Sequence, residues 1–562
     1  MRILVEQTTR MGDVLQTSPL IHAIKEQHPD AHITLLVRRM GKIIAQRHPD
    51  VDDILIYDED SLFLDLRSED SDRLLQAYEA AEAYINTIRD GNFDVAYNVT
   101  HSMASAQVLK MAGIPKVVGA HLSDDWQFVL RSSWATYFFT SVFSRDYNDL
   151  NLCDISRNFI PNATHTRQLY FDVLDEDRAA IDTLYSEHSI KDDDTVVCFQ
   201  LGASEENKRW SERRFAELGK LLHTEMNARI FLLGVEEEAS LGDTFESHAP
   251  GLGIPLYGKT SIPQVAALLE RSTLLVTNDT GTMHIAASVD CPITLVSVGH
   301  VHYRETGPYG PLHCAIEARR TSLGRSDFVP GAMEERELIT ADQVYRAAQL
   351  VLQSRKTQTI PRLPDNEELK GVDLYMTRFA PDGCLQFYPL LQRTMTEHDF
   401  VRIAYRAMWI EHLTGTSNKK AETESLQAML QHYTAPDPET AQSWAVTLSG
   451  QFEQLATIAQ RGMKTTEKLL ESLMKPKGMA QAKQYVGELM TLDEDSRIAG
   501  ELHPPCKPLI LIARFERDNL EGADPQVLAK TTHEIYGSCN TRARLMTQKL
   551  TRIAMLIAYN QA

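Results

Sequence analysis

The sequence predicts an α/β protein with two doubly wound, Rossmann-like domains and a helical region behind them. Short apolar runs alternate with amphipathic stretches, which predicts a parallel sheet with helices on both faces. The first two runs are Ile3–Val5 and Ile33–Val37, and the rhythm starts again at Thr195–Gln200. Beyond residue 356, apolar residues fall at helical spacing between short glycine and proline breaks, which predicts a helical bundle.

The length of the chain supports three domains, because 562 residues exceed what one hydrophobic core holds. We expect a first Rossmann-like domain at residues 1–190, a second at 191–355 and a helical bundle extension at 356–562. No motif in the extension carries chemistry. Three roles stay open for it: joining copies into a homo-oligomer, docking a protein, or forming a membrane-facing platform.

The composition indicates which partners and which cellular compartment to expect. A net charge of −20 argues against a general nucleic-acid binder, which would carry a basic surface. Seven scattered cysteines without a CxxC pair suggest a reducing compartment and no cysteine-rich metal site. No apolar run is long enough to span a membrane. We therefore expect a cytoplasmic protein, with peripheral association at the cytoplasmic face of the inner membrane left open.

The first glycine turn supplies a candidate general base. Arg10-Met11-Gly12-Asp13 follows the first strand and precedes a helix. It is no dinucleotide fingerprint, which needs three glycines. Ligands of such sheets bind beyond the carboxyl ends of the strands, where Asp13 lies. A carboxylate there can take a proton from a hydroxyl. The alternative, which the residues alone favour, is that Asp13 caps the helix starting at Val14.

Other polar residues of the first domain also follow predicted strands. Arg38 and Arg39 come after the second strand, and His101 comes after the strand at 94–98. Together with Gly12 they are our candidates for binding an acceptor. The alternatives are a solvated helix face for the two arginines and an ordinary surface histidine for His101.

The strongest anion-binding signal lies in the second domain. Asp279-Thr280-Gly281 joins a buried strand to a helix, so free backbone N–H groups and the positive end of the helix dipole meet any ligand there. Gly281 lets a ligand approach the backbone, and His284 follows about one turn later. The alternative is a helix capped by Asp279 or Thr280.

Two further turns of the second domain carry residues that could bind a nucleotide. Ala203 and Ser204 follow a strand, and Lys208 comes shortly after them. Lys208 could bind a diphosphate as a point charge, or it could be a solvated lysine on a loop. After the next strand, a carboxylate among Glu236–Glu238 could accept hydrogen bonds from ribose. The alternative for these three is a helix start favoured by the dipole.

Four ordered motifs carry a resemblance to the bacterial heptosyltransferases of glycosyltransferase family 9. They are Arg10–Leu15 with Thr17-Ser18-Pro19, Leu201–Ser204 with Lys208-Arg209-Trp210, Thr277–His284, and Thr306–Gly310. The resemblance covers residues 1–353 and implies the GT-B fold of two Rossmann-like domains. Thr282 departs from it, because the family usually has proline there, and the cysteine cluster that many members carry after the fourth motif is missing.

The resemblance also implies roles for the matching residues. Asp13 would deprotonate the acceptor hydroxyl and Lys208 would neutralise the leaving diphosphate. The donor would be bound by the residues of the second domain, namely Ala203, Ser204, Lys208, Glu237 (as the middle of the three glutamates), Asp279, Thr280, Gly281 and His284. Closure of the two domains about a hinge near 170–192 would bring Asp13 to the donor carbon.

The implied function is metal-independent, inverting transfer of a heptose from ADP-heptose to a lipopolysaccharide core or related cell-surface glycan. The ADP-sugar is a co-substrate, so no cofactor is expected. We read neither acidic run, Asp58–Asp60 nor Asp192–Asp194, as a metal site. Two alternatives stay open: O-glycosylation of a surface or flagellar protein acceptor, and a non-catalytic binding or scaffold protein on the same fold.

Overall fold

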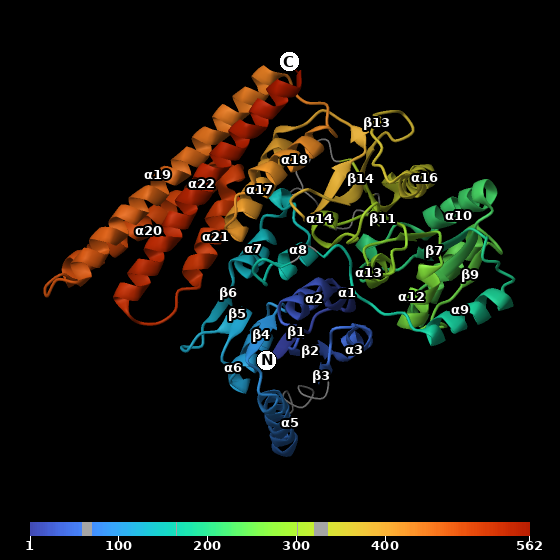
Figure 1. The fold of residues 1–562 in the computed structure, drawn as a ribbon, viewed down its shortest axis with the longest axis horizontal. Coiled ribbons are helices and arrows are strands. Elements are labelled where there is room, and N and C mark those ends of the chain that lie inside the picture. The colour runs from blue at the N-terminus through green and yellow to red at the C-terminus, as the bar shows by residue number, and fades with distance from the viewer. Residues whose placement is uncertain (59–69, 164–165, 301, 320–334, 562) are drawn as a thin grey trace.

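The computed structural model describes residues 1–58, 70–163, 166–300, 302–319 and 335–561. Within them the chain forms two large sheets with flanking helices, a small sheet of β13 (Leu363–Pro364) and β16 (Leu391–Gln392), and a group of long C-terminal helices (Figure 1). The predicted fold class is therefore confirmed.

The first sheet has six strands in the order β3-β2-β1-β4-β5-β6. All neighbours are parallel except β5 and β6. Its strands are β1 (Arg2–Gln7), β2 (His32–Arg38), β3 (Asp53–Tyr57), β4 (Val95–Asn98), β5 (Val117–Leu122) and β6 (Phe128–Arg131). Its helices are α1 (Met11–Gln16), α2 (Ser18–Gln27), α3 (Lys42–Gln46), α5 (Ser71–Asp90) and α6 (Met103–Ala112). Central β1 is buried from Ile3 onward, as its apolar run predicts.

The second sheet has eight strands in the order β15-β14-β12-β11-β10-β7-β8-β9. Its parallel strands are β7 (Val196–Gln200), β8 (Arg229–Leu233), β9 (Gly253–Pro255), β10 (Leu274–Thr277), β11 (Ile293–Ser297) and β12 (Cys314–Ala318). The helices around it include α9 (Asp175–Glu187), α10 (Glu212–Met226), α11 (Ala239–His248), α12 (Ile262–Glu270), α13 (Gly281–Ser288) and α16 (Ala341–Thr357). β7 and β10 are neighbours, so the turns that follow them lie side by side.

Two strands of the second sheet come from a part of the chain in which the sequence suggested mainly helices. β14 (Val372–Phe379) and β15 (Leu385–Pro389) form an antiparallel hairpin that pairs with β12. The hairpin is short and almost wholly buried, so its apolar residues show no clean alternation. The C-terminal region is thus joined to the second domain through a shared sheet.

Apart from the hairpin and the short strands β13 and β16, the C-terminal region is mainly helical, as predicted. It contains α17 (Glu397–Thr414), α18 (Lys419–Leu430), α19 (Pro438–Leu473), α20 (Met479–Leu502), α21 (Lys507–Asp518) and α22 (Pro525–Gln561). The long helices α19 and α22 pack along each other and extend away from the two sheets (Figure 1). No helix in the described part of the chain is long and apolar enough to cross a membrane.

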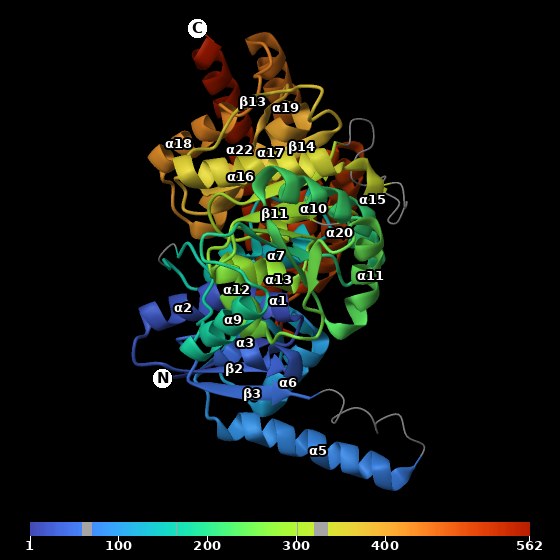
Figure 2. The same cartoon turned by 90° about the vertical axis from the view of Figure 1, so that its right-hand side faces the viewer.

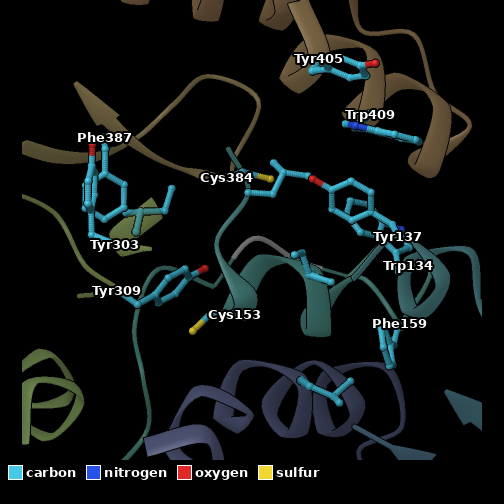
Figure 3. Close-up of a cluster of buried hydrophobic side chains, with 14 of the residues drawn as sticks. Trp134, Tyr137, Cys153, Phe159, Tyr303, Tyr309, Cys384, Phe387, Tyr405 and Trp409 are labelled. Carbon is cyan, nitrogen blue, oxygen red and sulfur yellow. The ribbon is translucent and has the colours of Figure 1, made fainter. Parts of the chain in front are cut away.

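The C-terminal region also packs on the first domain: α21 contacts α7 (Ser133–Ser141), and β15 is hydrogen-bonded to α8 (Leu152–Arg157). Figure 3 shows aromatic side chains of both domains and the extension gathered at this junction, where the rings of Tyr137 and Trp409 lie 5.0 Å apart. Beside them, a buried ion pair joins Arg402 of α17 to Asp149 at 2.7 Å. The extension therefore contacts both domains rather than hanging from one.

Candidate functional site

A cleft of about 670 Å³ lies between the two domains. Helix α1 of the first domain meets helix α13 of the second at its floor, and Figures 1 and 2 both show these helices side by side. The cleft is lined from the first domain by Arg10, Met11, Gly12, Asp13, Gln16 and Arg145. From the second domain the polar lining includes Gln200, Ser204, Lys208, Glu238, Asp279, Thr280, Thr282, His284, His300 and His302.

The start of α13 is open to a ligand. Thr280 is the N-cap residue, but its side chain makes no capping hydrogen bond to the helix. Its Oγ1 lies 3.3 Å from Oγ1 of Thr277 instead. The capped-helix alternative therefore does not describe this turn. The first N–H groups of α13 point their partial positive charge into a cleft that Gly281 also lines.

Asn278 joins this turn to the turn that follows β7. It is fully buried, and its Nδ2 donates a hydrogen bond of 2.8 Å to the carbonyl of Leu201. Its Oδ1 accepts one of 2.9 Å from the backbone N–H of Trp210. These bonds fix the loop carrying Ala203, Ser204 and Lys208 beside Asp279. Asn278 could not be recognised from the local sequence, because its partners lie about 70 residues away.

Lys208 faces the cleft rather than solvent. Only 9% of the residue is exposed, and its Nζ lies 3.4 Å from Oε1 of Glu205. The solvated-loop alternative is therefore wrong for this lysine. The ion pair with the half-exposed Glu205 is long, which leaves the ammonium group able to meet a second anion.

The three glutamates after β8 are not equivalent. Glu237 is exposed, whereas Glu238 lines the cleft and its Oε2 accepts a 3.2 Å hydrogen bond from Nε2 of Gln200. Gln200 in turn accepts a 3.0 Å bond from Thr282. Of the three, Glu238 faces the cleft and Glu237 does not. A 3-10 turn at Glu236–Glu238 sets this register, which the run of three identical residues concealed.

Asp13 lies at the start of a helix and lines the cleft. It is the third residue of α1, which begins at Met11 rather than Val14, and its Oδ2 accepts a 3.2 Å bond from the N–H of Arg10. The same oxygen lies 2.7 Å from Oγ1 of Thr9. No described protein group donates a hydrogen bond to the other oxygen, Oδ1. The carboxylate is therefore oriented by its helix and keeps one oxygen for a ligand.

His284 lies where the two domains touch. Its ring is buried, and its Nε2 lies 3.1 Å from Nε2 of Gln16 in α1. Burial lowers the pKa of His284 to about 4, although Asp13 acts in the opposite direction. A Cβ atom added at Gly12 would lie 2.9 Å from Cδ2 of this ring. Gly12 thus permits close approach of the two domains, and it also lines the cleft.

The other residues predicted to bind the acceptor do not all lie at the same site. Arg38 and Arg39 do not line the cleft, and Arg39 pairs with Asp58 with most of its side chain exposed. His101 lines a smaller pocket that also contains Asp13. Two arginines that were not among the predicted site residues, Arg10 and Arg145, also line the cleft and add positive charge to it. Arg10 could have been predicted, because it stands at the start of the first glycine turn.

Asp279 has the most perturbed carboxyl group of the cleft. Burial raises its pKa to about 6; Lys208 opposes this shift and Asp13 adds to it. Because the folded pKa lies above the ordinary value, this group's contribution to stability is present at low pH and is lost as the pH rises through 6.

We expect Asp279→Asn to raise the free energy of unfolding at pH 8 by about 1–2 kcal/mol, since it removes a poorly solvated charge. The gain should shrink as the pH falls from 6 toward 4, and thermal melts across this range measure it. Asp243→Asn, at an exposed position of α11, is the control and should show no such trend. A gain independent of pH would contradict the assignment.

No group of three or more His, Cys, Asp or Glu residues in the described ranges could hold a metal ion. In the second acidic run, Asp192 pairs with Arg271 and Asp194 accepts a hydrogen bond from the N–H of Lys191. Residues 59 and 60 of the first run lie outside the described residues.

Two Rossmann-like domains that face each other across a cleft form the GT-B fold. Residues 82–323 match the model of glycosyltransferase family 9 (heptosyltransferase). The chain is thus a glycosyltransferase, and its residues 82–323 are similar to the family 9 heptosyltransferases.

Individual relatives agree with this assignment. Lipopolysaccharide heptosyltransferase 2 of Salmonella typhimurium is 23% identical over 304 residues, which is 52% of this chain and 81% of that protein. Lipopolysaccharide heptosyltransferase 1 of Campylobacter coli is 21% identical and aligns over 60% of this chain and 97% of its own length. A family 9 glycosyltransferase structure from Veillonella parvula superposes with a TM-score of 0.52 at 19% identity, covering 63% of this chain and 97% of that one.

Proposed function

We propose that the protein transfers a heptose from ADP-heptose to a hydroxyl group of a lipopolysaccharide core, with inversion at the anomeric carbon. The observation that carries this proposal is the arrangement of one cleft: a carboxylate with a free oxygen on one wall, and a buried lysine with an open helix N-terminus on the other. The relatives' names support heptose and lipopolysaccharide as the substrates.

The donor would lie along the second domain. Glu238 would accept hydrogen bonds from the ribose hydroxyls, and the diphosphate would meet Lys208 and the first N–H groups of α13. Asp279 and His284 would then face the transferred sugar. His284 is neutral at pH 7 because its pKa is about 4. Its Nε2 already accepts a hydrogen bond from Nε2 of Gln16, so Nδ1 carries the proton and can donate a hydrogen bond to a sugar hydroxyl.

The chemical step would be one displacement. Oδ1 of Asp13 takes the proton of the acceptor hydroxyl as its oxygen forms a bond to the anomeric carbon. The bond from that carbon to the diphosphate breaks on the opposite face, and its electron pair leaves with ADP. Negative charge grows on the diphosphate, where Lys208 and the α13 dipole stabilise it. These fixed positive groups supply the charge that a divalent cation would otherwise provide.

The relatives favour a glycan or glycolipid over a protein as acceptor, and the cleft favours catalysis over a scaffold role. A scaffold would have no use for a carboxylate and a buried lysine on facing walls. We further propose that the protein acts in the cytoplasm, close to the inner membrane where a lipopolysaccharide acceptor is built. An oligomer through the C-terminal helices remains a separate proposal.

A nucleotide-binding melt tests the donor site first. ADP should raise the melting temperature, because a ligand at about 1,000 times its Kd stabilises the native state by about 4 kcal/mol. UDP and GDP should do so less. Glu238→Ala should reduce the ADP shift, and Glu237→Ala is the matched control that should leave it unchanged. No shift with any of the three nucleotides would refute the donor site.

A further inference from the structure

A second pocket, of about 130 Å³, lies on the other side of Asp13 from the donor cleft. Asp13 and Gln16 line both spaces. The pocket has a polar wall and an apolar wall. The polar wall comprises Gln7, Thr9, Thr17, Thr100, His101 and Ser156, and the apolar wall comprises Val99, Phe138, Leu152, Ile155 and Phe159.

His101 carries an unused hydrogen-bonding atom at this pocket. Its Nδ1 lies 2.9 Å from the carbonyl oxygen of Val99. A carbonyl oxygen can only accept, so Nδ1 must carry the proton of the neutral ring, and Nε2 must carry the lone pair. Nε2 is buried and has no hydrogen-bond partner in the described part of the protein. A buried acceptor without a partner is costly, and a ligand hydroxyl would satisfy it.

The backbone supports a functional role for His101. Its φ is 56°, in the left-handed region that residues other than glycine seldom adopt. Such strain persists where surrounding structure holds it and is common at ligand sites. The ring of Phe138 lies 4.7 Å from the His101 ring and fixes its orientation from α7. The imidazole is thus held in place by its backbone, its Nδ1 bond and an aromatic neighbour.

We propose that this pocket binds a hydroxyl-bearing edge of the acceptor sugar, and that His101 is a positioning residue whose Nε2 accepts a hydrogen bond from an acceptor hydroxyl next to the reacting one. The proposal rests on the proposed transferase function and specifies its acceptor side. At roughly 30 Å³ per water molecule, the pocket has room for a few hydroxyl groups and one ring edge rather than for a large chain. The acceptor would extend from it past Asp13 into the open cleft.

Burial lowers the pKa of His101 to about 4, with the Val99 bond acting in the opposite direction, so the ring stays neutral at pH 7. A neutral ring accepts a hydrogen bond at Nε2, whereas a protonated ring would donate one. His101 therefore selects a hydroxyl donor and discriminates against acceptors in which this hydroxyl is missing or methylated.

His101→Asn tests the proposal, because asparagine tolerates the left-handed backbone and removes Nε2. With ADP-heptose as donor and a heptose-free lipopolysaccharide core oligosaccharide as acceptor, the KM for the oligosaccharide should rise about tenfold. The KM for ADP-heptose and the melting shift caused by ADP should not change. A purely structural role would instead move the donor readouts as well.

His48→Asn is the matched control. His48 is also a buried histidine of the first domain, but it lines neither pocket and its Nε2 lies 3.3 Å from the carbonyl of Ser18. It should lower stability and leave the acceptor KM unchanged. If His101→Asn folds poorly, Phe138→Leu, which removes the ring packed against His101, should show the same selective rise in acceptor KM.

An unchanged acceptor KM in folded His101→Asn and Phe138→Leu would overturn the inference while the transferase function stands. A wild-type protein that binds ADP but transfers nothing to the oligosaccharide would overturn the proposed function, and this inference with it. The two failures are distinguishable, because the first appears only in the variants and the second already in the wild type.

Discussion

Replacing Asp13 by asparagine is expected to lower the rate of heptose transfer about 10³-fold, which is within the usual contribution of a general base. Asparagine preserves the size of the side chain and can still accept the hydrogen bond that Asp13 takes from the N–H of Arg10. It cannot take a proton from the acceptor. Single-turnover transfer from ADP-heptose measures the loss, and the ADP-induced melting shift should persist because Asp13 lies on the wall opposite the donor groups.

Asp194→Asn is a close control for the capping role of Asp13. Asp194 also accepts a hydrogen bond from the N–H three residues before it, that of Lys191, at 3.0 Å, but it lies on an exposed turn. Its replacement should change neither transfer nor ADP binding. If Asp13→Asn instead lost stability and ADP binding together while transfer per bound donor stayed normal, Asp13 would be a helix cap and not a base.

The local sequence predicted most of the sheet framework, since buried parallel strands are continuous apolar runs. Ile3–Val5, Ile33–Val37 and Thr195–Gln200 all lie within or at the start of observed strands. The hairpin β14–β15 was not predicted, because its pairing with β12 is a long-range contact that nothing in its own pattern reveals. The division at residues 190 and 355 stays a prediction, and this hairpin shows that the extension and the second domain share a sheet.

The positions of those site residues that directly follow a strand could be predicted from the sequence. The turns after β1, β7 and β10 carry Asp13, Lys208 and Asp279, and parallel pairing places the last two turns next to each other. Side-chain register was not predictable: whether Glu237 or Glu238 faces the cleft depends on one 3-10 turn. The burial of Lys208 and the linking role of Asn278 likewise depend on contacts between distant segments.

The extension bears on the expected closure of the two domains about residues 170–192. Arg402 pairs with Asp149 of the first domain, and the backbone N–H of Leu385 in β15 donates a 2.8 Å bond to Oδ2 of Asp154. Breaking a buried ion pair by moving one partner is costly, by about 3–5 kcal/mol when the partner is removed. The extension therefore favours one fixed domain angle, and hinge motion stays a prediction for comparison with and without nucleotide.

Lys208→Met is expected to lower the transfer rate about 10²- to 10³-fold, the usual cost of losing one group that stabilises developing charge. In the proposed mechanism, the ammonium group would interact with the diphosphate most strongly in the transition state, because negative charge grows there as the bond to the sugar breaks. The loss should therefore appear mainly in kcat, with a smaller rise in the KM for ADP-heptose. Methionine keeps the length of the apolar stem, so the 9% exposed site stays filled.

Two controls separate charge from packing at this position. Lys208→Arg keeps the positive charge with a different shape and should recover part of the rate. Lys110→Met removes a lysine that pairs with Asp124 on the outside of the first domain, and it should leave kcat unchanged. If Lys208→Met slowed transfer no more than Lys110→Met, Lys208 would have no part in the chemical step. The charge on the leaving diphosphate would then have to be stabilised by the α13 N-terminus and the arginines of the cleft.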